Sequence, residues 1–214
     1  MMFPLPLHKE HLVWLLFAGG VLLFLWAQTA HAADRYWVGA GNSVSDRWEN
    51  AANWSALPRG AGGASVPGTS DLAIFSFSGS TARIRSAVNV GGVFLANSFT
   101  GSLLQGTGTL TIGTSDFRVG SGTFIGHNTA INIADLFTMT GGIVRGVHGT
   151  LTLSGSFSIT DGSAVGTPSF TSTGTLLFDG GADQNFTKGA STTMRLWNLT
   201  LQNSGDGTSD DIVS

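Results

Sequence analysis

The sequence contains no cysteine, only two lysines and few charged residues of any kind. Of its 214 residues 11% are charged, and the formal net charge is −3. The absence of cysteine excludes disulfides, thiol chemistry and cysteine-ligated metals. A chain with so little charge, and with no long basic run, is not built to neutralise phosphates. We therefore expect no nucleic-acid partner.

Helical periodicity is missing behind the N-terminal segment. Glycine occupies 31 positions and interrupts nearly every window long enough to test for an amphipathic helix. The mean hydropathy is nevertheless +0.21, and large apolar residues recur at alternate positions. Alternation of this kind is typical of half-buried strands and not of a disordered chain. The sequence therefore predicts an all-β protein.

The N-terminal segment has the pattern of a secretory signal peptide. Lys9 precedes an unbroken apolar run from Leu12 to Trp26, and small residues flank His31 in Ala30-His31-Ala32. The run is shorter than the roughly 20 residues that a membrane-spanning helix needs. We predict cleavage after Ala32, so that 1–32 is a signal peptide and the protein is secreted or displayed at the cell surface. An uncleaved membrane anchor is the alternative.

The rest of the chain is long enough for one domain of ordinary size. Its composition divides it into three parts. Residues 33–80 carry an aromatic N-terminal cap and the first strands, 81–203 carry the repeats, and 204–214 form a polar end that is frayed or truncated.

Regular spacing between about residues 106 and 180 indicates internal repeats. Phenylalanines recur at a constant interval, and glycines follow at the same interval. Each phenylalanine opens a short alternating stretch, and a second alternating stretch ends shortly before it. The residues in these columns are Phe117, Phe137 and Phe157; Gly122, Gly142 and Gly162; and Gly106, Gly126, Gly146 and Gly166.

A unit of roughly 20 residues with two or three short strands cannot bury its own apolar face. Stacking such units in parallel about 4.8 Å apart makes one continuous core, with the phenylalanines as an internal ladder. The expected fold is a right-handed parallel β-helix, that is, a β-solenoid. An antiparallel β-sandwich is the alternative, although a sandwich does not need a constant period.

Motifs on both sides of the repeats resemble those of a known group. An aromatic pattern precedes the repeats, from Tyr36-Trp37-Val38-Gly39 through Trp48 to Asn53-Trp54-Ser55, and Phe178-Asp179-Gly180 and Asn198-Leu199-Thr200 follow them. These motifs resemble the β-strand-repeat surface proteins of bacteria, the autotransporter-passenger and adhesin-like group. The resemblance implies a parallel β-helix at the cell surface and, because no anchor or second cap is recognisable, a fragment of a longer passenger or adhesin.

Three tryptophans, Trp37, Trp48 and Trp54, are the only residues singled out as a possible site. Their expected role is to cap the open end of the coil, because a solenoid needs a cover over its first turn. The alternative is that they stack on sugar rings, as exposed aromatics of secreted β-proteins can. In that case the chain is a carbohydrate-binding module.

No other residue set predicts chemistry. The acids of the repeat region do not share a column, so we place them in corners of the chain, where an aspartate can bond its own backbone. His127 and His148 are separated by about one repeat, but two histidines without a third ligand are a weak metal signal. We expect no cofactor and no bound metal. The acids of the repeat region are Asp116, Asp135, Asp161, Asp179 and Asp183.

The expected function is that of an exported, non-catalytic structural or adhesive protein. Its expected partners are host or matrix glycans or other copies of itself, and its only membrane contact is through the signal peptide or an anchor beyond this sequence. The alternative is part of a β-helix polysaccharide lyase or hydrolase, which would need grouped carboxylates on one outer face.

Overall fold

The computed structural model describes residues 32–39, 46–77, 79–162 and 167–202. Except for Ala32, the predicted signal peptide lies outside these residues, as do Gly166 of the glycine columns and the predicted polar end at 204–214. The described residues form 20 strands and one short 3-10 helix, Ala51–Asn53. No α-helix occurs among them, and nothing in these ranges is a helix long and apolar enough to span a bilayer. The predicted all-β class is confirmed.

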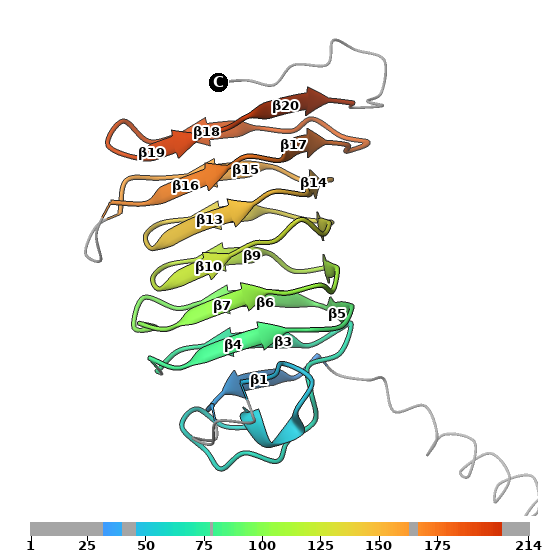
Figure 1. Cartoon of the computed structure of the whole chain (residues 1–214), viewed down its shortest axis with the longest axis vertical. Coiled ribbons are helices and arrows are strands. Elements are labelled where there is room, and N and C mark those ends of the chain that lie inside the picture. Colours follow the sequence, from blue (N-terminus) through green and yellow to red (C-terminus); the bar gives the residue numbers. More distant parts are fainter. Residues whose placement is uncertain (1–31, 40–45, 78, 163–166, 203–214) are drawn as a thin grey trace, which may run out of the picture. The chain divides into compact units, whose positions relative to one another are not determined.

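Eighteen of the strands wind into a coil of six turns, in which every turn gives one strand to each of three sheets (Figure 1). We call these sheets A, B and C, in the order in which the chain visits them. Turn 1 contains β3 (Leu72–Phe75), β4 (Thr81–Ile84) and β5 (Val88–Val90), and turn 2 contains β6 (Gly92–Leu95), β7 (Ser102–Gln105) and β8 (Leu110–Ile112). Turn 3 contains β9 (Phe117–Val119), β10 (Thr123–Ile125) and β11 (Ile131–Ile133), and turn 4 contains β12 (Phe137–Met139), β13 (Ile143–Val147) and β14 (Thr150–Leu153). Turn 5 contains β15 (Phe157–Ile159), β16 (Ser169–Ser172) and β17 (Thr175–Phe178), and turn 6 contains β18 (Phe186–Lys188), β19 (Thr193–Arg195) and β20 (Asn198–Leu201).

All strands of the coil pair in parallel, so the β-solenoid is confirmed and the sandwich alternative is wrong. The register aligns Phe117 with Phe137 and Phe137 with Phe157, which are the columns expected from the sequence. Among the described strands the one antiparallel pair joins β1 (Asp34–Trp37) to β2 (Trp54–Ser55), and β1 also continues sheet A beyond β3.

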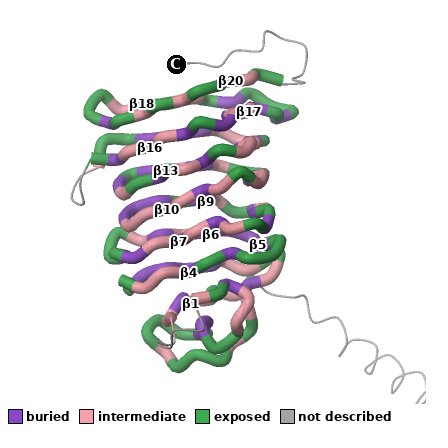
Figure 2. Tube along the Cα trace, viewed as in Figure 1, coloured by how far each residue is buried: buried purple, intermediate pink, exposed green. Residues whose placement is uncertain are grey.

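The core is a column of apolar side chains enclosed by the three sheets. Along the strands in the middle of the coil, buried residues alternate with half-buried or exposed ones (Figure 2), so alternate side chains point into the core. The phenylalanine ladder lies in this core, where the rings of Phe137 and Phe157 stack with centroids 4.8 Å apart. Phe186 continues the stack in turn 6, 5.3 Å from Phe157. Burial of these large rings adds to the hydrophobic stabilisation that the whole core provides.

Glycine is required where successive turns crowd together at the corners. Gly142 has a φ of +71°, which disfavours other residues. A Cβ atom there would also lie 2.7 Å from the carbonyl oxygen of Gly122, its counterpart one turn earlier. The regular glycine column therefore reflects close backbone contact between turns.

Turn 6 differs from the other turns because no described strand covers its far side. Leu199 pairs in register with Leu176, and Leu201 pairs with Phe178. Leu176 and Phe178 are 1% and 0% exposed, whereas Leu199 and Leu201 are 50% and 54% exposed although they occupy the same inward positions.

Candidate functional site

The three tryptophans of the predicted site lie together in the core at the start of the coil. Trp37, Trp48 and Trp54 are at most 3% exposed. Each ring lies against Phe75 of turn 1, with centroids 5.6 to 5.9 Å apart. This is the position that a cap requires, and it leaves none of the three ring faces open to a sugar.

Two of the three indole nitrogens of the cluster donate hydrogen bonds within the protein. The Trp54 indole N–H donates to the carbonyl oxygen of Trp48 at 2.7 Å, and that of Trp37 donates to the hydroxyl of Ser80 at 2.9 Å. A buried indole with a protein acceptor needs no external partner. The hydrogen bonds therefore favour a structural role for the cluster.

Glu49 ties the loop that carries Trp48 to turn 1. Its Oε1 accepts hydrogen bonds from the amides of Arg85 and Ser86, both at 2.8 Å, and from the Ser86 hydroxyl at 2.9 Å. Partial burial would raise the pKa of Glu49, but hydrogen bonds from its own backbone, from those of Ser86 and Arg85 and from the Ser86 hydroxyl outweigh burial and lower that pKa. The ionised carboxylate is the form that makes this connection.

The two histidines lie on successive turns but do not form a metal site. The amide of His148 donates to the carbonyl oxygen of His127 at 3.0 Å, so their separation by about one repeat does bring them together. The Nδ1 atom of His148, however, is hydrogen-bonded to the Thr173 hydroxyl of turn 5. Within the described ranges no three residues of the types His, Cys, Asp and Glu lie close enough to hold a metal ion.

Several aspartates of the repeat region hold the backbone or a neighbouring arginine. Asp161 accepts from the amide of Ser191 at 2.8 Å, and Asp116 accepts from Arg118 Nε at 2.7 Å. Asp135, Asp179 and Asp183 are exposed residues between strands. Four of the five acids thus lie at the corner between sheets C and A, spread from turn 2 to turn 6, and Asp161 lies at the corner between sheets A and B.

The three outer faces of the coil differ in chemistry. The strands of sheet C contain no charged residue, and their outward positions are mostly threonine and asparagine. The coil strands of sheet A carry two cations, Arg118 and Lys188, and Arg118 is ion-paired with Asp116. The strands of sheet B carry only cations, at Arg83, Arg145 and Arg195. Sheet B thus carries three of the five cations on the eighteen coil strands.

A column of outward residues crosses sheet B from the cap to turn 4. The register runs from Arg47 to Arg83, then to Leu104, to Ile125 and to Arg145. We call these five residues the basic column. Paired strands are about 4.8 Å apart, so Arg83 and Arg145 lie on the order of 14 Å from each other.

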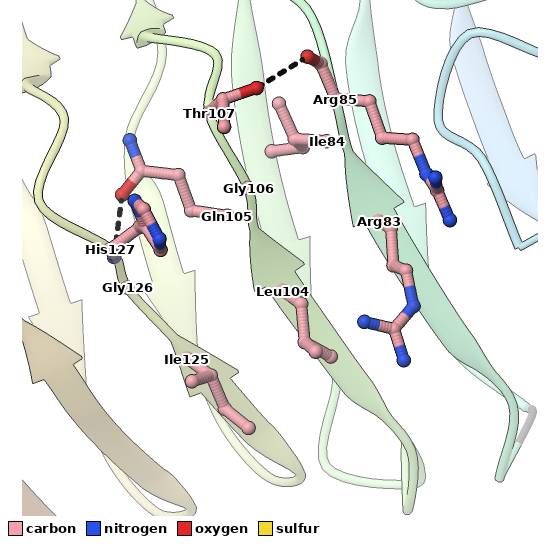
Figure 3. Close-up of a pocket in the computed structure, with 10 residues that line it drawn as sticks. All are labelled: Arg83, Ile84, Arg85, Leu104, Gln105, Gly106, Thr107, Ile125, Gly126 and His127. Atoms are coloured by element: carbon pink, nitrogen blue, oxygen red, sulfur yellow. Dashed lines mark hydrogen bonds between the residues drawn. The ribbon is translucent and has the colours of Figure 1, made fainter.

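A groove of about 470 Å³ lies beside this column and spans turns 1 to 3 (Figure 3). Its walls include Arg83, Arg85 and His127, and Leu104 and Ile125 provide apolar surface. The polar side chain of Gln105 is held by the protein, because its Oε1 accepts from the amide of His127 at 3.2 Å.

Asp46 is the acidic neighbour of the groove. It forms an ion pair with Arg83 and lies 3.8 Å from Arg85 Nη2. In the described parts of the chain, no carboxylate forms an ion pair with Arg145. The column therefore contains cations in excess of their acidic neighbours.

Sequence reasoning missed the basic column, although one signal could have revealed it. Residues 83, 104, 125 and 145 follow the repeat period, at intervals of 21, 21 and 20. The repeat is recognisable in the sequence where identical residues recur at a constant interval. This column changes from arginine to leucine to isoleucine, so it has no such mark.

Comparisons with known proteins found no matching family model, no matching curated protein and no matching solved structure. The likeness to bacterial surface proteins therefore remains a likeness of sequence motifs. The parallel six-turn solenoid stands on the strand register alone.

Proposed function

We propose that this chain is the solenoid segment of an exported cell-surface protein with a structural or adhesive role and no catalytic activity. The observation that carries the proposal is the six-turn parallel coil with a buried aromatic cap at its start and a sixth turn whose inward residues are half exposed. Such a coil suits a stalk that continues into further turns or meets another surface. The signal-peptide pattern of residues 1–32 supports the location.

Export is tested with the full chain expressed in a bacterium that has a periplasm. We expect the exported product to begin at Ala33, as measured by intact-mass spectrometry. The control is the double variant Ala30→Gln/Ala32→Gln, which places large residues before the cleavage point and should leave the N-terminus uncut. A wild-type product that retains Met1 would contradict the signal peptide.

The structural role is tested on the purified product with a panel of polysaccharides. We expect no release of reducing ends and no unsaturated products, because Asp161 and Asp116 are engaged with the Ser191 amide and with Arg118, and no group of three His, Asp or Glu side chains gathers within the described ranges. Turnover of any polysaccharide that survives repurification would establish the enzyme alternative.

A further inference from the structure

We propose that the basic column and the adjoining groove on sheet B bind an acidic polysaccharide, with arginines holding carboxylates and Leu104 and Ile125 contacting the sugar rings. The inference deepens the adhesive role proposed above by naming the surface and the class of ligand. Three features carry it: the three arginines that share one column of sheet B, the apolar pair within that column, and the strand backbone, whose hydrogen-bonding groups are all used within the sheet.

The first feature is the clustering of cations on one face. Arg47 and Arg83 are register neighbours, and like charges directly across paired strands destabilise a sheet. Arg145 extends the cationic surface on the far side of the apolar pair. An anionic ligand would relieve this repulsion, and the planar arginine fork matches a carboxylate.

The second feature is an apolar pair where polar residues are the rule. At the other outward position of β7 and β10 stand Ser102 and Thr123, but this column has Leu104 and Ile125. Both are half buried beside the groove. A ligand with CH surfaces between its charged groups fits such a surface better than a compact anion such as phosphate does.

The third feature excludes the commonest way of binding a peptide. β7 pairs with β4 on one side and with β10 on the other, so its backbone has no free edge. An extended peptide therefore cannot add a strand here. A polysaccharide does not need such pairing, because its carboxylates and ring faces make all the contacts.

Asp46 and Glu49 reduce the positive charge around the groove without neutralising it. Asp46 pairs with Arg83 and approaches Arg85, and Glu49 is engaged with the backbone of turn 1. Asp46 thus orients the Arg83 guanidinium at the rim of the groove, while Arg145 contributes a charge that none of the described acids neutralises. Arg145 is accordingly the most informative position to change.

The test measures binding of the full chain to sodium alginate, a uronic-acid polymer, at low ionic strength by calorimetry. We expect saturable binding that weakens as salt rises and no binding to neutral dextran of similar length. Arg145→Gln should weaken alginate binding about tenfold, because it removes one charge-assisted contact. Leu104→Ser/Ile125→Ser should weaken binding while leaving its salt dependence unchanged.

The matched control is Arg118→Gln, which changes an exposed mid-strand arginine on sheet A in the third turn. It should leave alginate affinity within twofold of the wild type, and thermal melting should verify that all variants fold. Absence of alginate binding, or an equal loss in the Arg118 and Arg145 variants, would overturn the site. Tighter binding of polyglutamate than of alginate would assign the groove to an acidic peptide. Each of these results can occur while the chain is still exported and cleaved after Ala32. The proposed polysaccharide site and the proposed export to the cell surface can therefore fail separately.

Discussion

The two ends of the solenoid place the same kinds of residue in opposite environments. At the start, Trp48 and Trp54 are buried against Phe75 of turn 1. In turn 6, Trp197 is 76% exposed, and the inward-facing Leu199 and Leu201 are half exposed. For the two leucines the difference does not come from the side chains themselves, because the register of turn 6 continues the columns of turn 5.

This contrast shows that burial in a stacked coil is supplied by the neighbouring turn. The apolar side chains of a turn point into the coil. They are fully buried only when a cap or another turn packs on each side of that turn. Stability should therefore be unequal along the axis, high near the cap and in the middle and low at turn 6. Three pairs of substitutions, ordered from the largest effect to the smallest, test how stability is distributed along the coil.

The largest effect is expected from Trp48→Ala, which removes a fully buried ring from the cap. It should lower the free energy of unfolding by about 3 to 5 kcal/mol, the usual cost of truncating a large buried aromatic. Trp197→Ala makes the same chemical change at the exposed end and should cost less than about 0.5 kcal/mol. Urea denaturation measures both, and similar losses in the two variants would contradict the contrast between the ends.

A smaller effect is expected from leucines that occupy the same column one turn apart. Leu176→Ala should cost about 2 to 5 kcal/mol because it opens a cavity in the core. Leu199→Ala should cost about 1 kcal/mol or less, since half of that side chain is already in water. Chemical denaturation compares them. If Leu199→Ala proves as costly as Leu176→Ala, turn 6 is covered in solution, and sedimentation would show whether a second copy covers it.

The smallest effect concerns the connection between the cap loop and turn 1. Because folding lowers the pKa of Glu49, its contribution is fully present above its ordinary pKa of about 4.3 and is lost as the pH falls through the lower folded value. Glu49→Gln should cost less than about 1 kcal/mol at pH 6, and this cost should shrink as the pH is lowered towards 3.

This pH dependence is measured by urea denaturation at several pH values. Asp135→Asn, which neutralises an exposed carboxylate between strands, is the control and should cost little at either pH. A penalty for Glu49→Gln that stays constant from pH 6 to pH 3 would show that the carboxylate charge does not stabilise the cap.

The strands that repeat in the middle of the chain were predictable because identical residues mark them. Phe117, Phe137 and Phe157 stand in register in the structure, as do Leu110, Ile131 and Leu151. Large apolar residues on one face of a strand must stay in the core, so the columns keep their chemistry. The burial of the tryptophans was likewise expected from their size.

Turns 5 and 6 and the basic column were not predictable in the same way. Phe157 pairs with Phe186, and Ile143 pairs with Ser169. Both intervals are longer than the one that separates Phe137 from Phe157. The corners absorb the extra residues without disturbing the core, so a search for a constant period loses the pattern. Outward positions face water and are free to change type from turn to turn, which hid the basic column.

The parallel stacking also has a mechanical consequence. The hydrogen bonds between successive turns run along the axis of the coil, so tension applied along that axis acts on every layer of bonds and breaks the weakest layer first. Each released turn would lengthen the chain by roughly 70 to 100 Å, given about 3.5 Å per extended residue and the spacing of paired residues in successive turns. Turn 6, with its half-exposed leucines, would yield first, and the tryptophan-covered start would yield last. A stalk of this design would behave as a graded, extensible tether.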